Sequence, residues 1–182
     1  MAGLLTTNWK YLFAALAAPP LVILLGSRLK AQTPTANPYR NLRAFLITIQ
    51  YAEGTYGPDA YKMLYGGSLF SGYGSHPNRH ITKSGITSTA AGAYQIMFST
   101  WQTVARSIGL DDFSPLNQDR AAIELIRRRG ALEDVFNGRL EAAIEKCRKE
   151  WASFPGAGYG QGERSITALA TIYQRAGGSS AA

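Results

Sequence analysis

"LITIQYAEGTYG", residues 46–57, ends an apolar run on a single carboxylate, Glu53, with a glycine directly behind it. The apolar positions before the carboxylate repeat with the i, i+3, i+4, i+7 spacing of an amphipathic helix: Leu42, Phe45, Leu46 and Ile49. Glu53 lies four residues after the last of these and falls on the same stripe, while Gly54 is typical of the position just past a helix end. The pattern predicts a helix whose last turn carries an acid on its core-facing side.

Such a position favours the protonated form of Glu53. The helix dipole disfavours negative charge at the C-terminal end, and apolar neighbours disfavour it again by desolvation. A carboxyl that keeps its proton near neutral pH can act as the general acid of glycosidic-bond cleavage. The alternative is a solvated helix-end glutamate, because glutamates are mostly exposed. The irregular segment that follows, residues 57–95, is rich in tyrosines and hydroxyl side chains and suits a sugar-binding groove.

The composition is that of a globular protein: 46% of the 182 residues are hydrophobic and 17% are charged, enough for one compact domain. The net charge of +7 favours an anionic partner, whether nucleic acid, a membrane surface or an acidic wall polymer. The densest basic run, residues 127–129, ends a predicted helix, where it complements the helix dipole and stays solvated. Nucleic-acid binders usually show a basic stripe interleaved with aromatics, so we expect no nucleic-acid partner.

Cysteine and histidine are scarce in the chain. The one cysteine, Cys147, excludes an internal disulfide and lies on the apolar stripe of a predicted helix, where we expect a small buried side chain. His76 and His80 are four residues apart, but Pro77 between them argues against a shared helix face. We therefore expect neither a metal site nor a cofactor.

The first thirty residues differ from the rest. Residues 11–26, "YLFAALAAPPLVILLG", are uncharged and apolar, with Pro19 and Pro20 in the middle. This length falls between the core of an export signal and a full membrane span, and its hydropathy favours membrane targeting over a buried core helix. It is an anchor, an uncleaved signal or a cleaved signal, and its topology stays open. We expect residues 1–30 to target the membrane, residues 31–37 to form a polar linker, and the protein to be membrane-associated or exported to the periplasm or cell envelope.

The remainder predicts an α+β domain that begins at Pro38, with Asn37 as its N-cap. Helical stripes or start signals recur over four further stretches, at residues 97–108, 114–129, 140–151 and 166–173. Between the first two helices the chain is punctuated by glycines, and short strands are expected at 63–65 and 81–82. The predicted fold is mostly helical with a small early β lobe.

Four blocks carry a specific resemblance: "RAFLITIQYAEGT" (43–55), "YGGSLFSGYGSHP" (65–77), "STAAGAYQI" (88–96) and "WASFPGAGYGQ" (151–161). In this order they resemble the bacteriophage lambda lysozyme family, glycoside hydrolase family 104, over roughly residues 40–178. The resemblance implies a lysozyme-like catalytic domain at residues 38–178, mainly helical with a small β lobe beside the catalytic cleft. The last residues are low in complexity, and we expect a flexible tail at residues 179–182. The N-terminal apolar segment lies outside the resemblance.

The same resemblance implies an enzyme that cleaves the β-1,4 bond between N-acetylmuramic acid and N-acetylglucosamine in peptidoglycan. Family members are lytic transglycosylases, in which a glutamate matching Glu53 protonates the leaving oxygen. It then acts as base while the muramic C6 hydroxyl attacks, which gives a 1,6-anhydro end. The residues that match the family's groove are expected to bind substrate: His76, Ser88, Gln95, Tyr159 and Gln161. For His76, a structural role in a turn is an equal alternative.

The residues themselves give some support to chemistry with one carboxylate. Other common phage lysozymes place an aspartate nine residues after their glutamate, where this chain has Lys62. Asp59 is close by but follows Gly57 and Pro58 in a predicted turn. Two alternatives stay open: a true muramidase that uses water and a second carboxylate, and a non-catalytic, membrane-anchored wall-binding module. We expect a monomer that acts on peptidoglycan glycan strands, in a phage or a bacterial setting.

Overall fold

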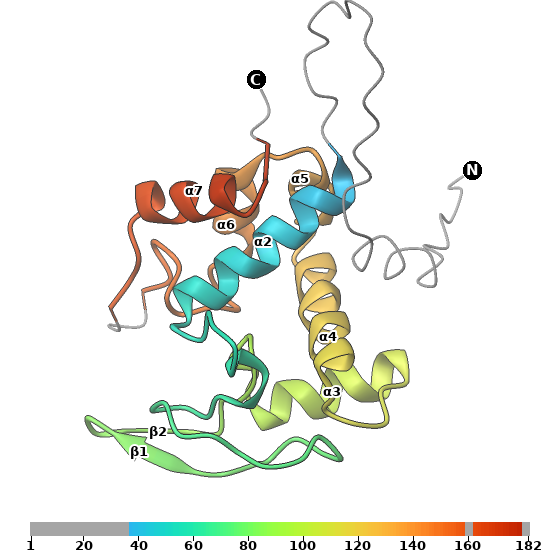
Figure 1. Cartoon of the computed structure of the whole chain (residues 1–182), viewed down its shortest axis with the longest axis vertical. Coiled ribbons are helices and arrows are strands. Elements are labelled where there is room, and N and C mark those ends of the chain that lie inside the picture. The colour runs from blue at the N-terminus through green and yellow to red at the C-terminus, as the bar shows by residue number, and fades with distance from the viewer. Residues whose placement is uncertain (1–36, 159–161, 180–182) are drawn as a thin grey trace, which may run out of the picture.

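The computed structural model describes residues 37–158 and 162–179, a helical body with a small β lobe beside it (Figure 1). In chain order the elements are α2 (Pro38–Ala52), the 3-10 helix η1 (Ala60–Lys62), β1 (Ile81–Lys83), β2 (Ile86–Ser88), α3 (Phe98–Ile108), α4 (Pro115–Arg128), α5 (Leu132–Phe136), α6 (Leu140–Cys147) and α7 (Ile166–Arg175). The apolar segment at 11–26 and nearly all of the predicted linker lie outside the described residues. Within the described ranges, none of the helices combines the length and the apolar character that a membrane span needs.

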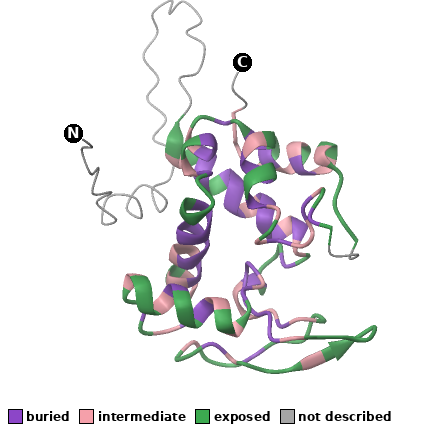
Figure 2. Ribbon diagram, turned by 180° about the vertical axis from the view of Figure 1, so that it is seen from behind, coloured by how far each residue is buried: buried purple, intermediate pink, exposed green. Residues whose placement is uncertain are grey.

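Helix α2 runs through the helical body and begins where the sequence predicts. The side chain of Asn37 accepts hydrogen bonds from the main-chain N–H groups of Tyr39 (3.1 Å) and Arg40 (3.2 Å), and Pro38 occupies the first turn. The apolar stripe of α2 is buried, and the helix packs against α5 and α7. Figure 2 shows the buried residues gathered on the inward faces of the helices. Each large apolar side chain buried there contributes about 1.5–3 kcal/mol, so α2 gives a firm base to the residues that follow Ala52.

The β lobe is a tight hairpin with loops folded beside it. Strand β1, predicted at its first two residues, pairs antiparallel with β2 along its length. Ser84 and Gly85 between them have φ values of 51° and 80°, the positive-φ pair that a type I′ hairpin turn requires. The strand predicted at 63–65 is wrong as a strand: it forms only isolated bridges, to Leu69 and Ala91. Two glycines with positive φ turn the chain directly after it and prevent a longer ladder.

The remaining helices begin and end close to the predicted residues. Gly109 adopts a φ of 64° and ends α3, and Ser114 precedes Pro115 at the start of α4. Met97 begins the helical stretch expected at residues 97–108, but it is 47% exposed because it precedes the first helical turn of α3. Trp151 lies past the end of α6 and is nevertheless buried, since its indole N–H donates to a main-chain carbonyl in the core (3.1 Å).

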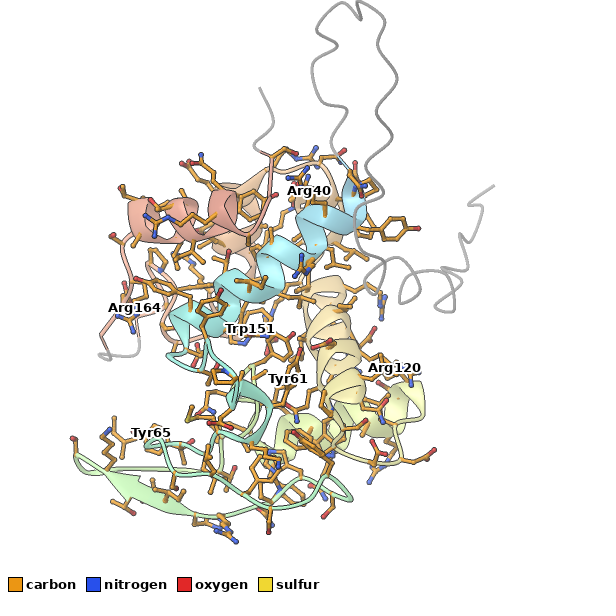
Figure 3. The ribbon with its side chains drawn as sticks, in the orientation of Figure 1. Arg40, Tyr61, Tyr65, Arg120, Trp151 and Arg164 are labelled. Carbon is orange, nitrogen blue, oxygen red and sulfur yellow. The ribbon has the colours of Figure 1, made fainter. Side chains whose placement is uncertain are left out.

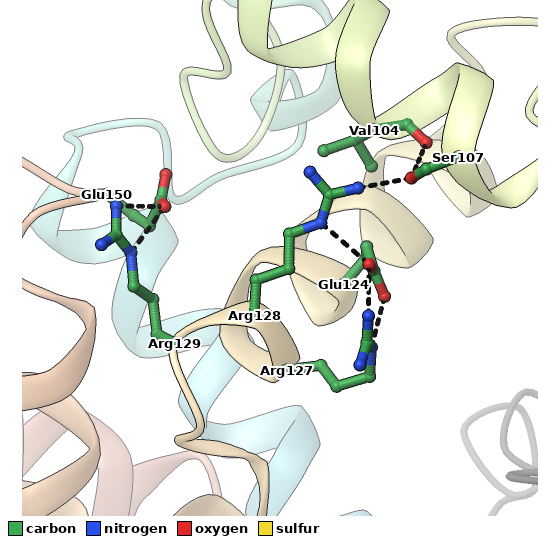
Figure 4. A network of polar contacts seen from close by, with 7 residues as sticks. All are labelled: Val104, Ser107, Glu124, Arg127, Arg128, Arg129 and Glu150. Carbon is green, nitrogen blue, oxygen red and sulfur yellow. Dashed lines mark hydrogen bonds and ion pairs between the residues drawn. The ribbon is translucent and has the colours of Figure 1, made fainter.

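The basic run at the end of α4 forms ion pairs (Figure 4). Arg127 and Arg128 bond to Glu124 at 2.7 and 2.9 Å, and Arg129 bonds to Glu150 at 2.6 Å. The prediction that this run stays solvated is therefore wrong in part: the guanidinium groups are partly exposed, but Arg127 and Arg128 share the carboxylate of Glu124 and Arg129 pairs with that of Glu150. The side chain of Glu124 is only 3% exposed, and burying it without these partners would be costly. This run accordingly stabilises the fold.

Candidate active site

A cleft of about 470 Å³ opens where the C-terminal end of α2 meets the β lobe. Its walls are residues 52–55, the turn at 63–67 with the tip of the hairpin, and a loop that carries Ser153. Figure 3 shows this flank of the molecule, with Tyr65 on the β lobe and Arg164 on the helical body. Segments far apart in the sequence therefore meet around one opening.

Glu53 lines this cleft as the first residue past α2, with its side chain half-buried. Its main-chain N–H donates to the carbonyl of Ile49 (2.9 Å), which holds the carboxyl at the negative end of the helix dipole. The hydroxyl of Ser153 donates to Glu53 Oε1 at 2.5 Å. Burial raises the pKa of Glu53; the hydrogen bonds from Ser153 and the charge of Arg164 oppose this shift without cancelling it. The carboxyl is therefore biased toward its protonated form at the wall of the cleft.

The loop that carries Ser153 is fixed to the end of α2. The main-chain N–H of Arg164 donates to the carbonyl of Ser153 (2.8 Å). The guanidinium of Arg164 reaches the carbonyl of Ala52 (3.4 Å) and lies 5.5 Å from the ring centroid of Tyr51. Glu163 accepts hydrogen bonds from two main-chain N–H groups of the same loop, at 2.8 and 3.0 Å. These contacts place the Ser153 hydroxyl beside the carboxyl.

The cleft is closed on its inner side by two segments joined through Thr55. Its buried hydroxyl donates to the carbonyl of Ala93 at 2.6 Å. Gln95, two residues further on, has a φ of 46°, a conformation that residues other than glycine rarely adopt. Its amide nitrogen donates to the carbonyls of Met63 (3.2 Å) and Gly92 (3.1 Å). Backbone strain of this kind clusters at functional sites. Because the amide nitrogen of Gln95 is held by the main chain, its amide oxygen is the end of the side chain that can accept a hydrogen bond.

The structure brings together only part of the predicted substrate-binding set. Gln95 lines the cleft with Glu53. Ser88 ends β2, where its hydroxyl accepts a hydrogen bond from the main-chain N–H of Ala90 (3.1 Å), and it does not line the described part of the cleft. Two further predicted residues lie outside the described ranges: Tyr159 and Gln161.

His76 occupies a structural position away from the described cleft wall. It is 4% exposed, its Nδ1 accepts from the main-chain N–H of Asn78 (3.1 Å), and its Nε2 donates to the carbonyl of Ile96 (2.8 Å). Its ring lies 4.6 Å from that of Phe113, centroid to centroid. Burial lowers the pKa of His76, which keeps the ring neutral, and the neutral tautomer satisfies both hydrogen bonds. The geometry matches the structural alternative for this residue.

Glu53 is the only carboxylate among the described residues that line the cleft. Asp59 is exposed at the start of η1 and lies outside this lining. Lys62, nine residues after Glu53, has its amine 5.6 Å from the ring centroid of Tyr73. Ser153, which the sequence did not single out, is the partner of the carboxyl from a distance of 100 positions. Its only signal was its place within the block at 151–161.

Comparisons with known proteins agree with this geometry. The family model described as Endolysin matches residues 43–180. The endolysin of Escherichia phage P2 is 42% identical over 161 residues, covering 80% of this chain and 98% of the relative. The endolysin of Escherichia phage lambda is 38% identical over 143 residues, covering 75% and 90%.

Solved structures give the same result. Bacteriophage lambda lysozyme complexed with a chitohexasaccharide matches with a TM-score of 0.74 at 38% identity. A further structure of lysozyme from bacteriophage lambda matches with a TM-score of 0.71 at 36% identity. Each comparison covers 78% of this chain and 96% of the other. The fold is that of lambda lysozyme, mostly helical with a two-stranded sheet, and the resemblance drawn from the four sequence blocks is confirmed.

Proposed function

The chain belongs to the endolysin family, and from this premise we propose that it degrades peptidoglycan by cleaving the β-1,4 bond between N-acetylmuramic acid and N-acetylglucosamine. Glu53 carries the proposal, because it is a carboxyl biased toward protonation at the wall of an open cleft. General-acid cleavage of a glycosidic bond needs such a group within reach of the leaving oxygen. The lambda lysozyme structure holds a chitohexasaccharide, which supports a glycan as the substrate here.

In the proposed reaction Glu53 acts twice. It gives its proton to the glycosidic oxygen as the bond to C1 of the muramic ring breaks. The resulting carboxylate then takes the proton of the C6 hydroxyl while that oxygen attacks C1. The ring closes as a 1,6-anhydro sugar, no water is consumed, and Glu53 ends protonated. Its position as the one carboxylate of the described cleft lining supports this lytic transglycosylase route, because hydrolytic glycosidases use a pair of acids.

We propose fewer direct substrate contacts than the sequence blocks suggest. The amide oxygen of Gln95 can accept a hydrogen bond from the N–H of an acetamido group, since its amide nitrogen is held by the main chain. Tyr159 and Gln161 stay in the proposed groove on the family resemblance. Ser88 is proposed as a contact near the hairpin end of the groove. For His76 we propose a positioning role, because both of its ring nitrogens are already bonded.

We further propose that residues 11–26 bring the enzyme to the membrane, followed by a linker at 31–37 and a monomeric catalytic domain at 38–178. The uncharged apolar run with a proline pair supports weak tethering followed by release, with action in the periplasm or cell envelope. Membrane fractionation with N-terminal sequencing of the cell-expressed full chain tests this. Protein that is always soluble with an intact N-terminus would refute membrane targeting, and permanently bound or cleaved protein would refute release.

The products formed by the full chain on purified peptidoglycan test the reaction. Mass spectrometry should find muropeptides one water lighter than hydrolysis products, and these should be absent with Glu53→Gln. Asp59→Asn is the matched control, since it removes an exposed carboxyl outside the cleft lining and should leave the products unchanged. Reducing ends of full mass would identify a muramidase that uses water and a second carboxylate. Binding without cleavage would leave a wall-binding module.

A further inference from the structure

A second hollow, of about 390 Å³, lies beside the proposed active site. Its lining comes from α2, from α4 and from the loops between them: Arg43, Leu46, Ile47, Gln50, Tyr56, Tyr61, Tyr94 and Asp119. Figure 3 shows Tyr61 at this place, between α2 and α4. We name the hollow the Asp119 pocket. The proposed cleavage reaction uses none of these side chains.

Asp119 is a half-buried carboxyl with one oxygen committed and one uncommitted. Its Oδ1 accepts hydrogen bonds from the hydroxyls of Tyr61 (2.9 Å) and Tyr94 (2.6 Å). Its Oδ2 receives no hydrogen bond, and Asp119 forms no ion pair, with any residue that the structure describes. A partly buried carboxylate without a counter-charge is unfavourable. A cation bound in the pocket would remove that cost.

The pocket also holds a positive charge that is not paired with Asp119. Arg43 projects from α2, is exposed, and makes no ion pair within the described part of the chain. Tyr56, which also lines the pocket, is 61% exposed. One cavity thus presents a carboxylate, a guanidinium and an aromatic surface. The complementary ligand carries an ammonium and a carboxylate on the same short group.

The Asp119 pocket and the cleft share a wall. Thr55 lines the cleft while its neighbour Tyr56 lines the pocket. In the same way Gln95 lines the cleft and its neighbour Tyr94 lines the pocket. Successive Cα atoms are 3.8 Å apart, so the Cα of Tyr56 lies within about 11 Å of that of Glu53. An extended peptide of three residues spans about the same distance. A short extended peptide is therefore long enough to pass from Glu53 on the cleft side of this wall to Tyr56 on the pocket side.

We propose that the Asp119 pocket binds the free end of a diamino acid in an uncrosslinked wall peptide, with its ammonium on Asp119 and its carboxylate on Arg43. Peptidoglycan carries its peptides on the muramic ring, so a glycan strand in the cleft would present one beside the pocket. This assignment rests on the proposed function, because it concerns the peptide of the same substrate. It predicts a preference for strands that still carry uncrosslinked peptides.

Peptides without sugar test the pocket separately from cleavage. The full chain with Glu53→Gln is titrated calorimetrically with two tripeptides that differ only in the last residue, meso-diaminopimelate or lysine. Both end in an ammonium, but only the first bears a carboxylate on the same carbon. The diaminopimelate peptide should bind about tenfold more tightly, the ratio that one charge-assisted hydrogen bond of about 1.4 kcal/mol gives.

Variants in the Glu53→Gln background assign the two charges. Arg43→Gln should bring both peptides to the same affinity, and because Arg43 is exposed this change does not threaten folding. Asp119→Asn keeps an acceptor for the tyrosine hydroxyls and should weaken both peptides about tenfold. Arg106→Gln and Asp111→Asn are matched controls on exposed positions outside the pocket lining and should bind as the parent does.

The two proposals fail differently. No binding of either peptide, equal binding of both by the parent, or an affinity that Asp119→Asn leaves unchanged would overturn the assignment of the pocket. Peptidoglycan cleavage by the wild-type chain would stand in each case. Selective peptide binding that Arg43→Gln abolishes would support the pocket even if the wild-type chain cleaved no peptidoglycan, a result that would overturn the proposed reaction alone.

Discussion

Removing the Ser153 hydroxyl tests whether the proposed acid is tuned by a distant loop. In Ser153→Ala, Glu53 Oε1 loses a donor that lies 2.5 Å away, while the helix end that carries the carboxyl is unchanged. A hydrogen bond to a carboxylate stabilises the charged form, so its loss must raise the pKa of Glu53 further. A general acid works only while it holds its proton. The alkaline limb of the activity profile should therefore move to higher pH.

The expected size of the move follows from the strength of one such bond. A hydrogen bond to a charged group contributes about 1.5–3 kcal/mol, and one pKa unit corresponds to about 1.4 kcal/mol. Taken alone this would give a shift of about one to two pH units. Glu53 is only half-buried, so water will replace part of the lost bond. We expect about one pH unit.

The assay is kcat/KM on soluble peptidoglycan fragments at constant ionic strength, from about pH 4, near the unperturbed pKa of a glutamate, to about pH 10. Ser99→Ala is the matched control, since Ser99 is an exposed serine of α3. It should leave the profile in place. An alkaline limb that stays at its wild-type position in Ser153→Ala, with the fold verified by circular dichroism, would show that the hydroxyl does not tune the acid. A limb that moves to lower pH would contradict the sign of the argument.

Three further outcomes are expected. The pKa of Glu53 is raised in the folded state, so the contribution of Glu53 to stability falls as the pH rises from its unfolded pKa to its folded pKa. In thermal scans Glu53→Gln should therefore melt at a higher temperature than wild type at pH 8. At pH 4, roughly the unperturbed pKa of a glutamate, the two should melt at the same temperature. Gly92→Ala would put a Cβ 2.1 Å from Oε1 of the buried Gln118, at a residue whose φ is 76°. The free energy of unfolding in urea should fall by about 3 kcal/mol or more. In the control Gly74→Ala the new Cβ has no atom within 4 Å, and the loss should be less than about 1 kcal/mol. Burial raises the pKa of Cys147 to about 12, so a thiol reagent at neutral pH should label it only at the rate of unfolding.

Local rules predicted much of the fold. The start of α2 at Pro38 and the end of α3 at Gly109 depend on the backbone geometry of one or two residues, which the sequence states directly. The burial of Cys147 followed from its place on an apolar stripe. Where an element depends on a few residues of ambiguous pattern, prediction failed. Helix α5 is five residues long, Leu132–Phe136, and gave no signal, and the bridges around residues 63–65 depend on partners brought there by the fold.

The candidate site shows the same difference between features that follow from local sequence and features that depend on distant contacts. Glu53 could be proposed from a helical stripe and one glycine, because the burial that raises its pKa follows from its position at the end of its own helix. For His76 the sequence leaves a groove role and a structural role in a turn equally open. Main-chain atoms bind both ring nitrogens, one of them from a residue 20 positions away, and this matches the structural role. Contacts across such separations leave no periodicity to detect. Only the folded chain shows them.

Retention and release of the proton are set by different parts of the chain. Burial at the end of α2 raises the pKa of Glu53 and lets it keep a proton, but an acid held too tightly is a poor donor, since catalysis is best when the pKa lies near the working pH. Ser153 and Arg164 both act in the opposite direction, and both belong to the segment that Arg164 fastens to the carbonyl of Ala52. Burial at the end of α2 therefore lets Glu53 hold its proton, and the loop that carries Ser153 lowers the pKa enough for the proton to be given to the substrate. A displacement of the loop should change the strength of the acid even where every atom of α2 stays in place.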